Sequence, residues 1–172
     1  SVQLAGLPGR AAGRNPLPSI DVVRKAAAGW GIEDGRPVYI YDGGNGLFAA
    51  RAWWVLRWAG VKDVHILDGG FATWDGEGFP TVAGPGGIVV PRDVELTEGS
   101  LPSATMEDVR AFEGLLIDAR GARRFQGLRE ILDLRAGHIP GARNLPVNDL
   151  FDPETHKVKD TDEIRDRFSQ LG

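Results

Sequence analysis

Apolar positions in the first half of the chain fall into short runs separated by longer helical patterns. Residues 38–41 and 64–67 are β-branched and aromatic runs of the kind that forms short buried strands. Residues 47–59 between them are apolar except for two arginines, so the pattern predicts a helix buried against a sheet. Another helix is predicted over residues 20–30, with Ser19 as its N-cap. This strand–helix–strand order with short connections predicts a parallel sheet in an α/β fold.

The composition changes over residues 76–100, where glycine, proline, valine and threonine predominate. We interpret this segment as an interdomain linker. Beyond it, Ser103 is expected to cap a helix that continues to Phe112, and a strand is predicted over residues 115–117 that ends at Asp118. A last helix is expected to begin at Asp160, an N-capping residue. The chain therefore carries secondary structure on both sides of a linker.

Composition and charge restrict the classes of function. The 172 residues are 42% hydrophobic with a formal net charge of −4, so we expect no nucleic-acid partner. No apolar run is long enough to span a membrane, and the N-terminal residues lack a signal-peptide pattern, so a cytoplasmic location is the default expectation. The sequence contains no cysteine, which excludes a disulfide, a thiolate metal site or a cysteine nucleophile within these residues.

Asp42 stands between the first predicted strand and the glycine-rich residues 43–46 that lead into the long apolar helix. A strand, such a loop and a helix N-terminus direct backbone N–H groups toward the residue at the strand end. We therefore predict an anion cradle that the Asp42 carboxylate itself fills. Asp42 is also expected to cap the helix, and its charge should exclude an anionic ligand from the cradle.

Three motifs in this part of the chain resemble the rhodanese family of sulfurtransferases. They are Tyr-Asp-Gly at residues 41–43, Ala-Arg-Ala-Trp-Trp at residues 50–54 and Leu-Asp-Gly-Gly-Phe at residues 67–71. The order and spacing resemble the first, non-catalytic domain of the two-domain members, the thiosulfate and 3-mercaptopyruvate sulfurtransferases. In that family the second domain has a cysteine at the corresponding loop position, where Asp42 stands here. The resemblance implies a rhodanese-like three-layer α/β fold.

Under this resemblance the chain consists of two partial domains. Residues 1–75 match the back part of a non-catalytic rhodanese domain, residues 76–100 form the linker, and residues 101–172 match the front part of a catalytic domain. We therefore interpret the chain as an internal fragment or a shortened descendant. One hypothesis is that the two parts complement each other as a single circularly permuted domain. Uncovered sheet edges offer a second outcome, which is self-association.

The second half contains two further motifs that resemble the catalytic rhodanese domain, Arg-Phe-Gln-Gly at residues 124–127 and Gly-His-Ile-Pro-Gly at residues 137–141. The resemblance implies that Arg124 faces the anionic sulfur donor and that Asp118 lies at the strand end near the active loop. Glu130 matches a frequent glutamate of the family, and the resemblance implies that Arg124, Asp118 and Glu130 together form the substrate-binding site. A guanidinium suits this task because it binds oxyanions bidentately.

Another interpretation of this region remains open, and the region also departs from the family at two places. Six arginines between residues 120 and 143 would also form a solvated surface paired with nearby acids. Relatives commonly have prolines around residues 130–134, where this chain has Glu-Ile-Leu-Asp-Leu, so the loop is expected to be less rigid. A second arginine of the mercaptopyruvate-type members is missing near Leu132 and Asp133. His138, by contrast, is expected to be a structural, hydrogen-bonded histidine.

The resemblance implies transfer of a sulfane sulfur from thiosulfate, or from 3-mercaptopyruvate, through a cysteine persulfide to cyanide or a thiol. The cysteine lies outside these residues, so the chain alone is expected to be inactive. We expect no cofactor and no bound metal, because the three histidines are too dispersed for a ligand pattern. The alternative is a catalytically inactive rhodanese-like module for binding or regulation.

Overall fold

The computed structural model describes residues 5–8 and 15–172, and the chain divides into two units, residues 1–103 and 104–172. We call them unit 1 and unit 2 and describe each by itself. Within the described ranges, no helix is both long and apolar enough to cross a membrane.

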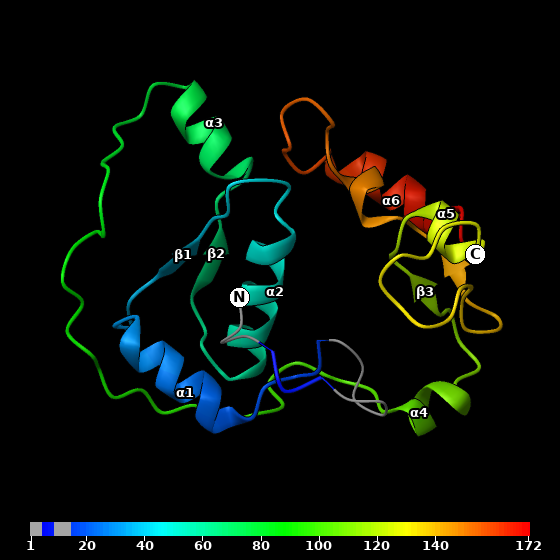
Figure 1. The fold of residues 1–172 in the computed structure, drawn as a ribbon, viewed down its shortest axis with the longest axis horizontal. Helices are drawn as coiled ribbons and strands as arrows, with labels where there is room; N and C mark the ends of the chain where they lie inside the picture. The colour runs from blue at the N-terminus through cyan, green and yellow to red at the C-terminus, as the bar shows by residue number, and fades with distance from the viewer. Residues whose placement is uncertain (1–4, 9–14) are drawn as a thin grey trace. The chain divides into compact units, whose positions relative to one another are not determined.

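Unit 1 is built around a parallel pair of strands, as the sequence predicts (Figure 1). In the register of β1 (Val38–Ile40) and β2 (Val64–Ile66), Tyr39 lies opposite His65. The long apolar helix α2 (Leu47–Trp58) connects the two strands and packs on both. Helix α1 (Ile20–Gly29) precedes the sheet and α3 (Gly70–Gly76) follows it. Strand–helix–strand order with parallel pairing confirms the predicted α/β class.

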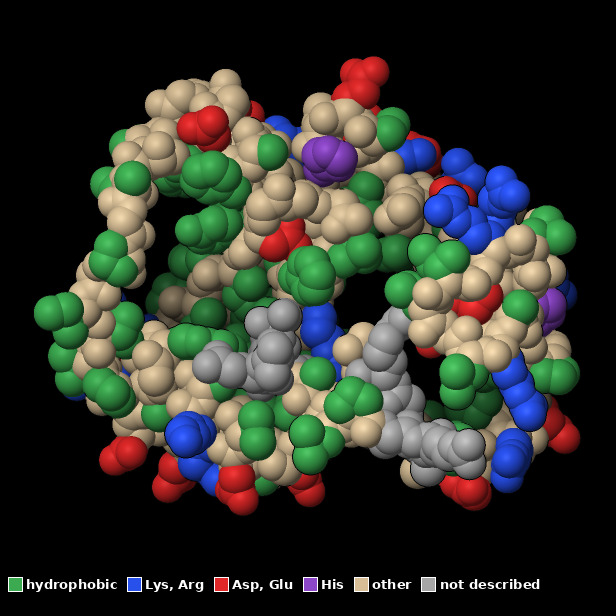
Figure 2. Space-filling view, in the orientation of Figure 1, with side chains coloured by type: hydrophobic (Ala, Val, Ile, Leu, Met, Phe, Trp, Pro, Cys, Tyr) green, Lys and Arg blue, Asp and Glu red, His purple; other side chains and the backbone are tan. Residues whose placement is uncertain are grey.

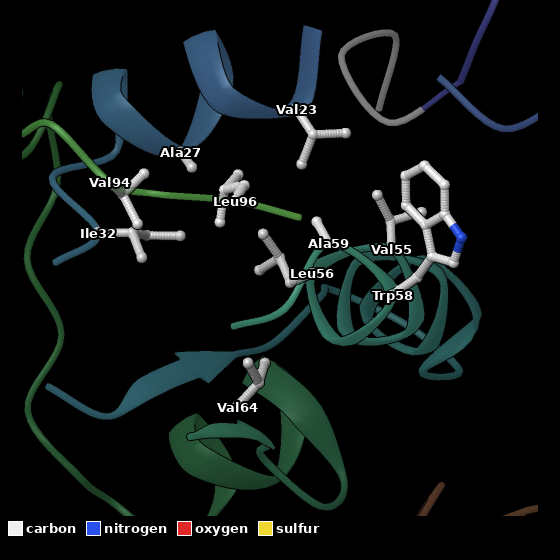
Figure 3. Packing of buried hydrophobic residues seen from close by; sticks show 10 residues of the cluster. All are labelled: Val23, Ala27, Ile32, Val55, Leu56, Trp58, Ala59, Val64, Val94 and Leu96. Atoms are coloured by element: carbon white, nitrogen blue, oxygen red, sulfur yellow. The ribbon is translucent and has the colours of Figure 1, made fainter. Parts of the chain in front are cut away.

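The hydrophobic core of unit 1 lies between α1, α2 and the sheet (Figure 3). The fully buried side chains of greatest volume belong to Leu56, Val23 and Val55. Val94 and Leu96 come from an extended segment that passes between α1 and α2, and both are at most 7% exposed. The core thus includes residues far beyond the last element of the predicted parallel sheet.

The segment that we expected to be a linker is partly packed on unit 1. After α3 the chain runs around the outside of the unit and returns beside α1 (Figure 1). There the N–H of Arg92 donates to the carbonyl of Ala28 at 3.1 Å, and the N–H of Thr97 donates to the carbonyl of Ala59 at 3.0 Å. Glycine and proline predict an open chain, but Val94 and Leu96 bury apolar surface, which stabilises the packed arrangement. Residues 92–100 are therefore not a free tether.

One face of the β1–β2 pair is open in unit 1. Successive side chains of a strand point to opposite faces, and Val38 and Ile40 pack against the core. On the other face Tyr39 is 69% exposed and stacks on the exposed ring of His65, with ring centroids 5.2 Å apart. Within the described residues the sheet has two strands. The expected division into two partial domains stays a prediction.

Unit 2 also contains one parallel pair of strands, β3 (Ile117–Asp118) and β4 (Arg143–Asn144). Its other elements are short: α4 (Met106–Arg110), α5 (Ala122–Phe125), the 3-10 helix η2 (Val147–Leu150) and α6 (Thr161–Ser169). Helix α4 begins two residues later than predicted, because Thr105 rather than Ser103 caps it in a capping box with Asp108. The capping role of Asp160 at α6 is confirmed, since its side chain accepts from the N–H of Asp162 at 2.8 Å.

Unit 2 has almost no apolar core of its own. Among its described residues, Leu145 is the single buried hydrophobic side chain. Ile131, Leu132 and Leu134 are 73%, 57% and 99% exposed, respectively. The apolar contribution to the stability of unit 2 taken by itself is therefore small.

Candidate functional site

The loop after β1 holds Asp42 in a cradle of four backbone N–H groups. Its Oδ1 accepts from Gly44 at 3.0 Å and Gly46 at 3.1 Å, and its Oδ2 accepts from Phe48 and Ala49, both at 3.1 Å. The last two donors belong to the first turn of α2, whose N–H groups have no partner within the helix. The predicted cradle is thus present, and the carboxylate of the chain occupies it.

This arrangement depends on glycine at two positions. Gly46 caps α2 in the left-handed region at φ 75°, and Gly70 has φ 60°. A Cβ on Gly70 would lie 2.7 Å from the carbonyl oxygen of Asp42, which is too close for any side chain. The same carbonyl accepts from the N–H of Phe71 at 3.0 Å, so the two glycine loops of unit 1 support each other.

The cradle also stabilises the charged form of Asp42. Partial burial raises the pKa of its carboxyl group, and the four backbone hydrogen bonds together lower it by more. The net pKa therefore lies below the ordinary value for aspartate. Asp42 is a permanent anion at neutral pH, and an exogenous anion would have to displace it.

A second cluster of charges lies at the end of β3 in unit 2. Arg120 donates to both carboxylate oxygens of Asp118, with Nη2 2.6 Å from Oδ2. Its Nη2 also donates to the carbonyl of Gly137 at 2.7 Å. Hydrogen bonds from the Arg120 side chain are the main reason that the pKa of Asp118 is lowered, and the same pair raises the pKa of Arg120. Both groups therefore stay charged.

Glu130 joins the same cluster and is held from two sides. Its Oε1 accepts from the backbone N–H groups of Leu132 and Asp133 at 2.8 and 2.9 Å. Arg124 donates to the same carboxylate through Nε and Nη2 at 3.0–3.1 Å. The pKa of Glu130 is lowered to about 2, mainly by these two backbone hydrogen bonds and to a smaller extent by the contacts with Arg124. With 6% of its side chain exposed, Glu130 is a fixed partner of Arg124.

Arg124 has a further acidic neighbour in Asp133. Its Nη2 lies 2.6 Å from Oδ2 of Asp133, whose side chain is 40% exposed. Nη1 of Arg124 has no hydrogen-bond partner in the described part of the chain. Nε and Nη2 of the guanidinium are therefore occupied by the two carboxylates, and Nη1 is able to donate to another acceptor.

The structure brings the three sequence-predicted residues of unit 2, Asp118, Arg124 and Glu130, into one network. Arg120 links them, because its Nη1 lies 3.8 Å from Oε2 of Glu130. The sequence analysis assigned donor binding to Arg124 and assigned no role to Arg120 or Asp133. The contact between Asp118 and Arg120 could have been predicted from their separation of two residues in the sequence. The contact between Arg124 and Asp133 depends on the conformation of the loop.

His138 has the structural role that we expected. Its Nδ1 lies 2.7 Å from the carbonyl oxygen of Phe125, and its ring stacks on that of Phe125 with centroids 3.7 Å apart. Over the described ranges, no group of three or more histidine, aspartate or glutamate side chains is arranged to hold a metal ion.

Unit 1 also contains an apolar groove that the sequence did not predict. Its volume is about 590 Å³. Figure 2 shows hydrophobic side chains bordering the hollow inside the segment that follows α3. Trp74 donates from its ring N–H to the carbonyl of Pro80 at 3.1 Å and so closes one side. The lining residues are Tyr39, Tyr41, Leu67, Phe71, Trp74, Pro80, Thr81 and Val82.

Comparisons with known proteins agree with the motifs. A family described as the rhodanese-like domain matches residues 2–77. A protein of Pseudomonas aeruginosa named "Probable 3-mercaptopyruvate sulfurtransferase" is 37% identical over 166 residues, covering 92% of this chain and 57% of that protein. A Mycobacterium tuberculosis protein named "Putative thiosulfate sulfurtransferase SseB" is 40% identical over 144 residues, covering 81% of this chain and 50% of that protein.

A solved structure supports the same assignment. The crystal structure of SseA from Escherichia coli, which is described with the rhodanese fold, matches with a TM-score of 0.70 and 32% identity. The match covers 98% of this chain and 63% of that one. The rhodanese-like α/β fold is thereby confirmed. The chain spans about half the length of the curated relatives that it matches.

Proposed function

The chain belongs to the rhodanese family, and from this premise we propose that it is part of a two-domain sulfurtransferase in which Arg124 binds the anionic sulfur donor. Under this proposal it is a fragment that lacks the cysteine loop. Sulfur would move from thiosulfate, or from 3-mercaptopyruvate, to cyanide or a thiol.

One observation carries the proposal: Arg124 keeps Nη1 available while Glu130 fixes the rest of its guanidinium. A preorganised guanidinium binds an oxyanion at a smaller entropic cost than a mobile one. The other arginine of the network, Arg120, is occupied by Asp118 and by the carbonyl of Gly137. Arg124 is therefore the better donor for an incoming anion.

Glu130 and Asp118 have supporting tasks in this proposal. Glu130 orients Arg124, and Asp118 holds Arg120 beside the same carboxylate. Neither acid touches the donor. Asp42 takes no part in the transfer, because its carboxylate fills the cradle that a reactive side chain would need.

The chemistry requires a thiolate that these residues do not supply. A thiolate attacks the outer sulfur of thiosulfate, the sulfur–sulfur bond breaks, and sulfite leaves with the bonding pair. The resulting persulfide then gives its outer sulfur to cyanide or to a thiolate acceptor, which regenerates the thiolate. The proposed task of Arg124 is to hold the donor anion during the first of these steps.

Titration of the chain with thiosulfate, followed by NMR of backbone amides and arginine Nε–Hε groups, tests the proposal. We expect saturable shifts centred on Arg124, and about tenfold weaker binding in Arg124→Lys, because a lysine loses the planar fork. Arg123→Lys is the matched control, since Arg123 is exposed and has no ion pair in the described part of the chain. Equal binding by both variants would remove Arg124 from the donor site.

A turnover measurement complements the titration. With thiosulfate and cyanide as substrates, the 172 residues alone are expected to form no thiocyanate, because they contain no cysteine. Turnover above the blank would contradict the assignment of the nucleophile to a cysteine outside these residues.

A second candidate function is a catalytically inactive rhodanese-like module for binding or regulation. The observation that favours it is the carboxylate in the cradle of unit 1, which blocks anion binding there. The thiosulfate titration separates the two candidates, because a module of this kind has no need to bind the donor at Arg124.

A further inference from the structure

Arg124 contacts two carboxylates, and the two differ in how firmly they are held. Glu130 accepts hydrogen bonds from two backbone N–H groups and from two guanidinium nitrogens, and its side chain is 6% exposed. The Asp133 carboxylate meets Nη2 of Arg124 at 2.6 Å, but its side chain is 40% exposed. Glu130 belongs to the framework of the site, whereas Asp133 reaches the same guanidinium from a solvent-exposed position.

The exposed side chain of Asp133 has room to rotate away from Arg124 while the backbone N–H of Asp133 stays bonded to Glu130. Residues 131–135 lie outside the helices and strands of unit 2, and the neighbouring side chains of Ile131 and Leu134 are 73% and 99% exposed. Few apolar contacts therefore restrain the loop. Residues 130–135 contain no proline, so the backbone lacks that source of rigidity.

The balance of charge in the network changes with the position of Asp133. Two guanidinium groups, Arg120 and Arg124, face three carboxylates, Asp118, Glu130 and Asp133. The network carries one excess negative charge while Asp133 is in place, and it is neutral once Asp133 has moved to solvent. A doubly charged anion such as thiosulfate would be repelled by the first state and tolerated by the second.

From these contacts we propose that the Asp133 carboxylate occupies the position of an oxyanion on Arg124 and competes with the sulfur donor for this guanidinium. This inference rests on the proposed function, because it assigns a competitor to the same donor site. Asp133 would be a determinant of donor affinity. It would weaken binding of a donor that needs Nη2 more than binding of a donor that contacts Nη1 alone.

The expected size of the effect follows from the exposure of the pair. Ion pairs that are partly open to water contribute little, so removal of the Asp133 charge should strengthen thiosulfate binding by about two- to fivefold. The gain should shrink as salt is added, because salt screens charges in contact with solvent.

The experiment compares thiosulfate affinity in the whole chain and in four variants by NMR titration at low and high salt, and Arg124→Lys is the variant that tests the donor site itself. Asp133→Asn and Asp133→Ala both remove the competing charge. Both keep the backbone N–H of residue 133, which donates a hydrogen bond to Glu130. Asp166→Asn on α6 is the matched control, because it removes the same formal charge from an exposed position. Tighter binding in both Asp133 variants at low salt, with Asp166→Asn unchanged, supports competition.

The remaining outcomes separate the inference from the proposed function. If the Asp133 variants bind as the unchanged chain does while Arg124→Lys loses affinity, competition is wrong and the donor site stands. An equal gain in Asp133→Asn and Asp166→Asn also overturns competition, because it would be an effect of net charge. If no protein binds thiosulfate, including Asp133→Asn, both the donor site and its competitor are wrong.

Discussion

Units 1 and 2 each hold a carboxylate at the end of a parallel strand, but they neutralise it in different ways. Asp42 in unit 1 is surrounded by backbone N–H groups of a loop and a helix. Asp118 and Glu130 in unit 2 also accept backbone N–H groups, but in addition each contacts a guanidinium, that of Arg120 or Arg124. Backbone donors are fixed by the fold and cannot change partner, whereas a guanidinium can exchange one anion for another. The proposed binding of an exchangeable anion therefore belongs in unit 2 rather than in the cradle of unit 1.

The two units also differ in what stabilises them. Unit 1 has a cluster of ten buried hydrophobic side chains, and unit 2 has one buried hydrophobic side chain among its described residues. Stability in unit 1 should therefore depend on apolar volume, and stability in unit 2 on its network of charges and hydrogen bonds.

The largest expected effect tests the core of unit 1. Leu56 is 1% exposed, so Leu56→Ala should lower the free energy of unfolding of unit 1 by about 2–5 kcal/mol. Tryptophan fluorescence during urea unfolding measures unit 1 selectively, because all five tryptophans lie within residues 1–103. Leu134→Ala in unit 2 is the control. Leu134 is 99% exposed, and we expect a change within about 0.5 kcal/mol. Similar losses in both variants would contradict the comparison.

The second effect tests the network of unit 2. The pKa of Glu130 is lowered from 4.5 to about 2 in the folded chain. A lowered acid pKa contributes stability that is present above pH 4.5 and is lost as the pH falls through about 2. Glu130→Gln should weaken the protection of unit 2 amides from hydrogen exchange at neutral pH. It should also remove most of the pH dependence of that protection between pH 4.5 and about 2.

Amide hydrogen exchange across this pH range measures the effect of Glu130→Gln. Glu113→Gln serves as the control, because Glu113 is exposed and has no ion pair in the described part of unit 2. If both variants keep the acid transition of the unchanged chain, the Glu130 network does not stabilise unit 2.

The smallest expected effect tests the cradle of unit 1. Asp42→Cys places a thiol beside N–H groups of the α2 N-terminus, which should lower its pKa by about one unit from the usual value of about 8.5. The pH dependence of alkylation measures this pKa. Ala83→Cys provides a reference thiol at an exposed position in the extended segment after α3, away from any helix N-terminus. Equal pKa values for the two thiols would mean that the cradle does not stabilise an anion.

Local pattern was sufficient for the framework of unit 1. The strand predicted over residues 38–41 spans Val38–Ile40, and the helix predicted over residues 47–59 spans Leu47–Trp58. These elements were predictable because their apolar positions repeat at the period of the structure that they form. The cradle at Asp42 followed from the same local order of strand, glycine loop and helix.

Contacts between residues far apart in the sequence were harder to predict from the sequence alone. The glycine- and proline-rich composition of residues 76–100 predicts a linker, yet Val94 and Leu96 lie in the core of unit 1. Their spacing of two residues was a signal, but a pair of apolar positions is too short a pattern to predict burial. The start of α4 was also misplaced, because Ser103 and Thr105 are both acceptable N-caps and only the contact with Asp108 selects the second.

The sequence by itself determined the family, the α/β class, the strand–loop–helix unit at Asp42 and the residue types of the arginine network. Only the tertiary structure decided which carboxylate each arginine contacts, and that Asp133 shares Arg124 with Glu130. The reason is physical. Helices and strands form from neighbours whose spacing is written in the chain, whereas a guanidinium selects its partners from all the acids that the folded backbone brings within a few ångströms.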